Sequence, residues 1–175
     1  MEIIINGIKT NIIVMGEGTP FLILHGWGSN SERWQKVGEL LSQKGFKIII
    51  ADLPGFGKSD LPQTPWNINN YVNWSEQLIK ELNLKDFYLL GHSFGGALAS
   101  KIAVKYSQEI KKLFLVSAAC VRKKTAKKSF LKKISKIVKI FYFLPYYSFF
   151  RKAIYKFIIQ KSDYVYVQGI IRETY

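Results

Sequence analysis

The residues that decide the fold are Gly91-His92-Ser93-Phe94-Gly95, which lie between the apolar run FYLL at 87–90 and a segment of helical spacing at 96–106. The pattern G-x-S-x-G between a strand and a helix is typical of a very sharp turn that presents a serine hydroxyl. Glycines flank the serine because neighbouring chains come too close there for side chains. The hydroxyl would lie above a helix N-terminus, which favours a developing negative charge. For the pentapeptide by itself, an ordinary glycine-rich turn with a chance serine is the simpler alternative.

Around this turn, runs of β-branched and aromatic residues alternate with segments of helical spacing. This alternation predicts an α/β fold with a mostly parallel sheet and helices on both faces. The expected strands are residues 2–6, 10–15, 21–24, 47–51, 87–90 and 112–116, and the expected helices are residues 31–43, with Ser31 as the capping residue, 71–82 and 96–106.

Two more loops follow expected strands. His25-Gly26-Trp27-Gly28 comes directly after PFLIL, and Asp52-Leu53-Pro54-Gly55-Phe56-Gly57-Lys58-Ser59 comes after KIIIA. The second loop contains G-x-G, but it has no third glycine and opens no helix, so it is not a dinucleotide fingerprint. It is not a phosphate-binding P-loop either.

In this order, each after its own strand, the three loops resemble those of the α/β-hydrolase family, and the resemblance covers nearly all of residues 1–120. It implies that Ser93 is a catalytic nucleophile and that the backbone N–H groups of Trp27 and Phe94 form an oxyanion hole. It also implies that six residues shape the loops without catalysing: His25, Gly26, Asp52, Gly91, His92 and Gly95. No cofactor and no metal are expected.

A catalytic serine needs a histidine base that a carboxylate orients. In this family the order along the chain is serine, then Asp or Glu, then histidine. No histidine follows Ser93, and the carboxylates after Glu109 are those of Asp163 and Glu173. We therefore expect the chain to be a fragment of a longer hydrolase. Its hydrolase core is then incomplete, and the chain as given is inactive. A degenerate, non-catalytic member is the alternative.

Charge divides the chain into an expected core, residues 1–120, and an expected basic helical lid, residues 121–175. Lys and Arg outnumber Asp and Glu by 12 to 10 in the first segment and by 14 to 2 in the second. In the second segment lysines alternate with apolar residues at spacings of three and four, namely Phe130, Leu131, Ile134, Ile137, Val138 and Phe141. This pattern predicts a basic amphipathic helix. Its lysines either form a solvated surface or dock on an anionic membrane or acidic partner.

No nucleic-acid partner is expected, because no recognised motif accompanies the charge. The N-terminal residues do not have the pattern of a secretory signal, Cys120 is the single cysteine, and no apolar run is long enough to span a membrane. These features predict a cytoplasmic protein. The expected function is hydrolysis of an ester or a related acyl or carbon–carbon bond in a small apolar acyl substrate, through a Ser93 acyl-enzyme. The alternative is a non-catalytic binding module that attaches through the basic lid.

Overall fold

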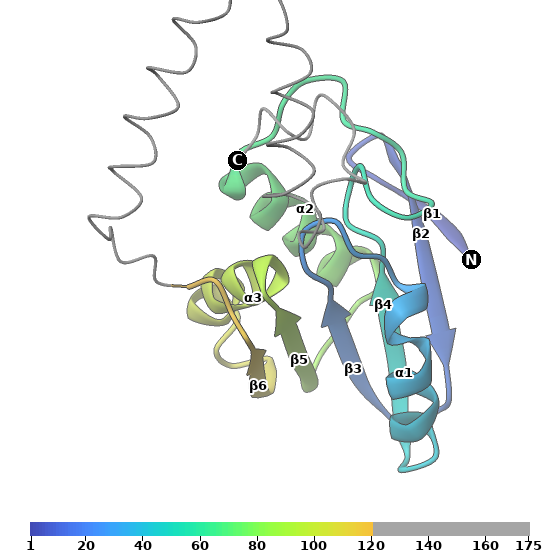
Figure 1. The fold of residues 1–175 in the computed structure, drawn as a ribbon. Helices are drawn as coiled ribbons and strands as arrows, with labels where there is room; N and C mark the ends of the chain where they lie inside the picture. Colours follow the sequence, from blue (N-terminus) through green and yellow to red (C-terminus); the bar gives the residue numbers. More distant parts are fainter. Residues whose placement is uncertain (121–175) are drawn as a thin grey trace, which may run out of the picture. The chain divides into compact units, whose positions relative to one another are not determined.

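The computed structural model describes residues 1–120, and the expected lid, residues 121–175, lies outside the described residues (Figure 1). The strands are β1 (Glu2–Ile5), β2 (Ile8–Met15), β3 (Thr19–Leu24), β4 (Phe46–Ala51), β5 (Phe87–His92) and β6 (Ile110–Val116). The helices are the 3-10 turn η1 (Glu32–Trp34), α1 (Gln35–Ser42), α2 (Ile68–Glu81) and α3 (Phe94–Lys105).

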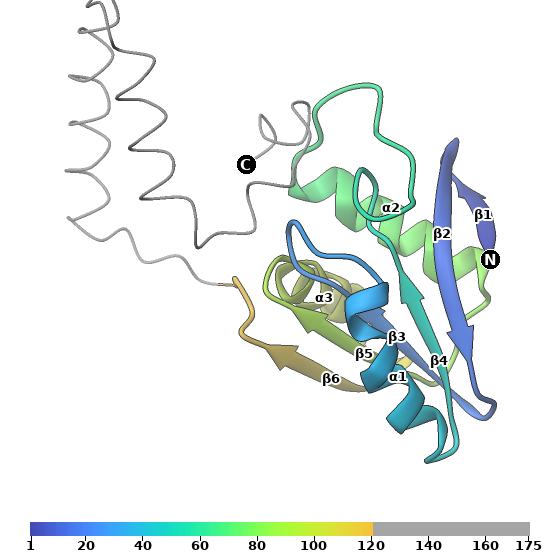
Figure 2. The same cartoon turned by 45° about the vertical axis from the view of Figure 1, so that its right-hand side comes forward.

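The six strands form one sheet in the order β1-β2-β4-β3-β5-β6. β4, β3, β5 and β6 run parallel, whereas β1 pairs antiparallel with β2 and β2 antiparallel with β4. Helix α1 covers one face, and α2 and α3 cover the other (Figures 1 and 2). The predicted α/β class, a mostly parallel sheet with helices on both faces, is therefore confirmed for the part of the chain that the structure describes.

Alternate residues of the central strands build two hydrophobic cores, because successive side chains of a strand point to opposite faces. Leu22 and Leu24 of β3 pack in the core beneath α2 and α3, together with the fully buried Tyr71 and Trp74 of α2. The intervening β3 side chains, Phe21 and Ile23, belong to the second core, on the face of α1. Burial on both faces explains the continuous apolar runs of these strands.

All three helix starts differ from the sequence prediction; α3 begins at Phe94, two residues before the predicted start. Helix α2 begins at Ile68, three residues before the predicted start, because Asn67 caps it: its side chain accepts N–H bonds from Asn69 and Asn70, and the Asn70 side chain accepts the Asn67 N–H. The prediction of Ser31 as a capping side chain was wrong. Ser31 precedes the short η1 turn and makes no capping hydrogen bond; its hydroxyl accepts a bond from Asn11 Nδ2 at 3.4 Å.

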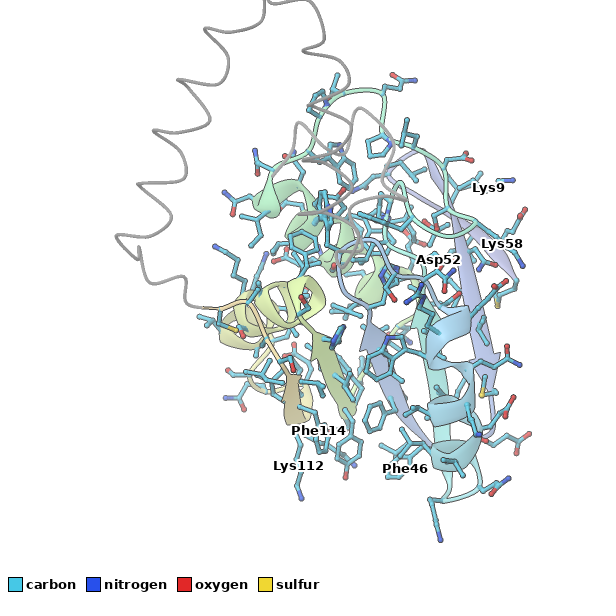
Figure 3. All side chains as sticks on the ribbon, in the orientation of Figure 1. Lys9, Phe46, Asp52, Lys58, Lys112 and Phe114 are labelled. Carbon is cyan, nitrogen blue, oxygen red and sulfur yellow. The ribbon has the colours of Figure 1, made fainter. Side chains whose placement is uncertain are left out.

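Strand β6 is the last strand of the sheet on the side away from β1, within residues 1–120. Its apolar side chains are only partly covered: Phe114, Leu115 and Val116 are 39%, 47% and 40% exposed. Figure 3 shows Phe114 and Lys112 on this outer strand. The described residues thus include a partly exposed apolar sheet edge. In the same part of the chain, no helix combines the length and apolarity needed to cross a membrane.

Candidate active site

Ser93 lies at the turn between β5 and α3 with φ 51° and ψ −112°, a backbone conformation that costs free energy for any residue other than glycine. Glycines flank Ser93 because other segments of the backbone approach closely at these two positions. A Cβ added to Gly91 would lie 2.3 Å from the carbonyl oxygen of Gly95, and one added to Gly95 would lie 2.1 Å from that of Leu24. The glycine spacing of the motif is thus a steric requirement of this turn.

Backbone hydrogen bonds hold Ser93 in its conformation. Its N–H donates to the carbonyl of Val116 at 3.0 Å, and its own carbonyl accepts N–H bonds from Gly96, Ala97 and Ala119 at 2.9–3.2 Å. The segment that follows β6 therefore clamps the turn from one side. Ala118 of this segment also packs on α3, since a Cβ added to Gly96 would lie 2.5 Å from its Cβ.

The loop after β3 lies against the same turn. A Cβ added to Gly26 would lie 2.8 Å from Nδ1 of His92 and 3.2 Å from Cβ of Ser93. The rings of Trp27 and Phe94 meet edge to face, with 5.1 Å between their centroids. The two residues whose N–H groups were predicted to form an oxyanion hole thus come together beside Ser93.

His25 is completely buried, and both of its ring nitrogens are engaged. Nε2 accepts the Leu53 N–H at 2.9 Å, so the proton of the neutral ring lies on Nδ1 and is donated to the Gly26 carbonyl at 2.8 Å. Burial lowers the pKa of His25 and outweighs the Gly26 carbonyl and the Asp52 carboxylate, which raise it. A neutral imidazole with two backbone partners ties the β3 loop to the β4 loop and has no nitrogen left to accept a proton.

The Asp52 carboxylate is 1% exposed and joins three parts of the chain. One oxygen accepts the backbone N–H of Ser31, and the other accepts Asn11 Nδ2 at 2.8 Å and the Lys58 N–H at 3.0 Å. The Ser59 hydroxyl donates to the Asp52 carbonyl at 2.8 Å. Figure 3 shows Asp52 and Lys58 near each other above α1. Every oxygen of Asp52 is thus committed to structure.

His92 lies on the α1 side of the turn. Its ring is 5.7 Å from that of Trp34, and its buried Nδ1 makes no hydrogen bond within residues 1–120. Two partners of the Asp52 carboxylate, Asn11 and Ser31, gave no sequence signal, because they come from segments 41 and 21 residues away. Only their contact in the folded chain identifies them.

Aromatic side chains surround the loop after β3. Trp27 contacts the rings of Phe56 at 5.0 Å and Tyr71 at 6.3 Å, and Tyr71 contacts Phe94 at 5.2 Å. The Tyr71 hydroxyl donates to the Pro54 carbonyl at 3.3 Å, and burial raises its pKa. The neighbourhood of Ser93 is therefore apolar, with a phenol that stays protonated.

Comparison with known proteins identifies the family. A model of the alpha/beta hydrolase fold matches residues 19–142. A 2-hydroxymuconate semialdehyde hydrolase of Pseudomonas is 30% identical over 123 residues, which are 69% of this chain and 44% of that protein. A pimeloyl-[acyl-carrier protein] methyl ester esterase of Pseudoalteromonas atlantica is 32% identical over 113 residues, 64% of this chain and 41% of that protein.

Among solved structures, an esterase from Exiguobacterium antarcticum is 28% identical with a TM-score of 0.68, over 79% of this chain and 55% of that one. A meta-cleavage product hydrolase from Pseudomonas fluorescens is 29% identical with a TM-score of 0.66, over 71% and 47%. The chain spans less than half the length of the two curated relatives named above. Its motifs, its sheet and these matches together show that the chain belongs to the alpha/beta hydrolase fold family.

Proposed function

We propose that Ser93 is the nucleophile of a hydrolase that cleaves an ester, or a related acyl or carbon–carbon bond, through an acyl-enzyme. The observation that carries the proposal is the strained backbone of Ser93, φ 51°, at a turn clamped between β6 and the loop after β3. Backbone strain concentrates at functional sites, where the surrounding structure maintains it.

In the proposed reaction, Ser93 Oγ attacks the carbonyl carbon and the π electrons move onto the carbonyl oxygen. The N–H groups of Trp27 and Phe94 would donate to that oxyanion, which is the largest single stabilisation in acyl transfer. The Oγ proton passes to a base and then to the leaving group. Water, deprotonated by the same base, releases the acid and restores Ser93.

The base of the proposed reaction is neither of the two histidines in the sequence, His25 and His92. Both ring nitrogens of His25 are hydrogen-bonded to backbone, and the His92 ring packs against Trp34 on the α1 side of the turn. No histidine follows Ser93 within these 175 residues, which match less than half of the two curated relatives. The proposed reaction therefore needs an acid and a histidine that these residues do not supply. The 175-residue chain is then a site without a base, and it does not turn over esters.

A small apolar acyl group suits the surroundings of Ser93. The rings of Trp27, Phe56, Tyr71 and Phe94 contact one another next to the turn. Aromatic walls bind apolar groups by burying large areas. The relatives named as hydrolases of an ester and of a semialdehyde are consistent with acyl chemistry of this kind.

The test compares residues 1–175 with a form extended by the natural downstream sequence, using p-nitrophenyl acetate. We expect hydrolysis by the extended form only. Ser93→Ala in that form should lower kcat at least about 10³-fold, since removal of a catalytic serine typically costs more. Ser100→Ala is the matched control, because Ser100 lies within α3, the helix that follows Ser93, and its hydroxyl bonds the Gly96 carbonyl and Cys120. Full activity of the Ser93→Ala form would refute the role of Ser93, and Ser93-dependent activity of residues 1–175 would refute the missing base.

A second candidate function rests on charge. Residues 121–175 carry 14 Lys and Arg against 2 Asp and Glu, and the first 120 residues are nearly balanced. A non-catalytic module that attaches through this segment to an anionic membrane or an acidic partner would have this distribution. Attachment to acidic vesicles by a form that hydrolyses no ester would favour this candidate.

A further inference from the structure

We propose that a cavity beside the site binds a carboxylate group, with Arg33 as its charge partner. The cavity, of about 280 Å³, lies between the loop after β3 and the loop after β4. Its lining comprises Gly28, Ser29, Asn30 and Arg33 from the first segment, and residues 55–57 from the second.

Charge makes the cavity selective for an anion. Arg33 is the one charged residue among those that line it. Two nearby carboxylates are already paired: Glu32 with Lys58 Nζ at 2.8 Å, and the buried Asp52 with the three N–H donors described above. No ion pair involves the Arg33 guanidinium within residues 1–120. The exposed Arg33 guanidinium is therefore available to an anion in the cavity.

Neutral donors complete the cavity. Asn30 Oδ1 accepts the backbone N–H of Arg33 at 3.2 Å, which leaves the Asn30 amide NH₂ to donate. Ser29, whose hydroxyl can donate a hydrogen bond, also lines the cavity. A planar guanidinium binds a carboxylate or a phosphate through two parallel hydrogen bonds, so hydrogen-bond geometry does not separate them. Charge does: the single positive charge of Arg33 balances one carboxylate, whereas a phosphate group carries about −1.5 to −2 at pH 7.

The position relates the cavity to Ser93. Gly28 directly follows Trp27 in the chain, and the ring of Phe56, which lines the cavity, contacts the ring of Trp27 at 5.0 Å. A substrate with an apolar acyl chain and a free carboxylate, such as the half-ester of a dicarboxylic acid, could occupy both regions. That the carboxylate belongs to a substrate rests on the proposed function, whereas carboxylate binding by the cavity does not.

The experiment is a titration of the ¹⁵N-labelled 175-residue chain with succinate, at constant ionic strength, followed by NMR. We expect saturable shifts of the Arg33 side-chain N–H and of the Gly28 and Ser29 amides, and none with neutral succinamide. Arg33→Gln should weaken binding about tenfold, the value of a charged hydrogen-bonded contact. Lys36→Gln, which removes an exposed charge nearby, is the control and should leave binding unchanged.

Asn30→Asp is a second variant, because the new carboxylate keeps the acceptor for the Arg33 N–H and competes for its guanidinium. It should also weaken succinate binding. Ser93→Ala should bind succinate like the unaltered chain, so failure of the serine proposal and failure of this one are distinguishable. Absence of saturable shifts, equal losses in Arg33→Gln and Lys36→Gln, or tighter binding of inorganic phosphate than of succinate would overturn the carboxylate assignment.

Discussion

Burial and two backbone hydrogen bonds fix the protonation state of His25. A second ring proton would point at the Leu53 N–H, which Nε2 now accepts, and would place a charge where no water can solvate it. The Asp52 carboxylate lies 3.9 Å from Nε2, but its oxygens are already occupied by other donors. His25 is therefore a structural link between two loops.

This environment predicts a pH dependence of stability. Because the pKa of His25 is lowered on folding, the unfolded chain takes up a proton first, at about pH 6.5. The contribution of His25 to the free energy of unfolding is fully present above that pH and declines as the pH falls through it, by at most about 1.4 kcal/mol per pH unit. Urea unfolding between pH 7.5 and 5.5 measures it.

The variant His25→Asn keeps a donor for the Gly26 carbonyl and should lose this part of the pH dependence. His92→Gln is the control and should keep it. The same slope in the unaltered chain and in His25→Asn would show that the histidine does not titrate as described.

A second prediction at this scale concerns Asp52. In Asp52→Asn the charge is lost, and the amide NH₂ must face one of the donors that the carboxylate now accepts. Buried donors left without an acceptor are costly, and we expect a loss of about 3 kcal/mol in the free energy of unfolding. Asp60→Asn, an exposed carboxylate of the same loop, should change it by less than about 0.5 kcal/mol. Similar losses in both variants would contradict a structural role for the Asp52 carboxylate.

At the scale of elements, local patterns predicted which strands and helices exist, because burial on two faces leaves apolar runs that short-range inspection detects. The residues at which the helices begin depended on individual hydrogen bonds between side chains and the backbone. The start of α2 at Ile68 was missed because Asn67 and Asn70 form the capping box with two amides, an uncommon pairing. Ser31 was wrongly predicted to cap a helix with its side chain. Its backbone N–H donates instead to the Asp52 carboxylate, 21 residues along the chain, and sequence alone does not show this contact.

The candidate site also has a part that the sequence predicted and a part that it did not. The glycines and Ser93 were predictable, since a sharp turn imposes a fixed local spacing. The cavity beside Arg33 was not, because its two walls come from loops more than 20 residues apart.

The basic segment carries a prediction of its own, for residues outside the described part of the chain. A peptide of residues 125–143 should gain helicity on anionic vesicles and only weakly on neutral ones, because its lysines are attracted to acidic headgroups and its apolar side chains then enter the interface. Circular dichroism with the two vesicle types measures this. A peptide with Lys127, Lys128, Lys132 and Lys133 changed to Gln should lose the preference. Equal helicity on both vesicles would remove the electrostatic argument.

At the scale of the whole molecule, the described sheet has two dissimilar ends. At one end β1 is a short strand in an antiparallel pair with β2, and Glu2 and Lys9 form an ion pair there at 3.4 Å. At the other end β6 presents Phe114, Leu115 and Val116 with 39–47% of their surfaces exposed. Charged and short edges resist pairing with other chains, whereas a long apolar edge favours it.

The 175-residue chain should therefore self-associate through β6 as its concentration rises. Leu115→Lys places a charge on that edge and should shift the chain toward monomer, because a buried lysine opposes strand pairing between copies. The matched control is Val104→Lys, which replaces an even more exposed apolar side chain, 83% exposed, on α3 and away from the edge. Size-exclusion chromatography with light scattering over a range of concentrations measures the assembly. If the unaltered chain stays monomeric, the predicted self-association is wrong. If Val104→Lys disperses it as well as Leu115→Lys does, general hydrophobicity rather than the β6 edge governs its association.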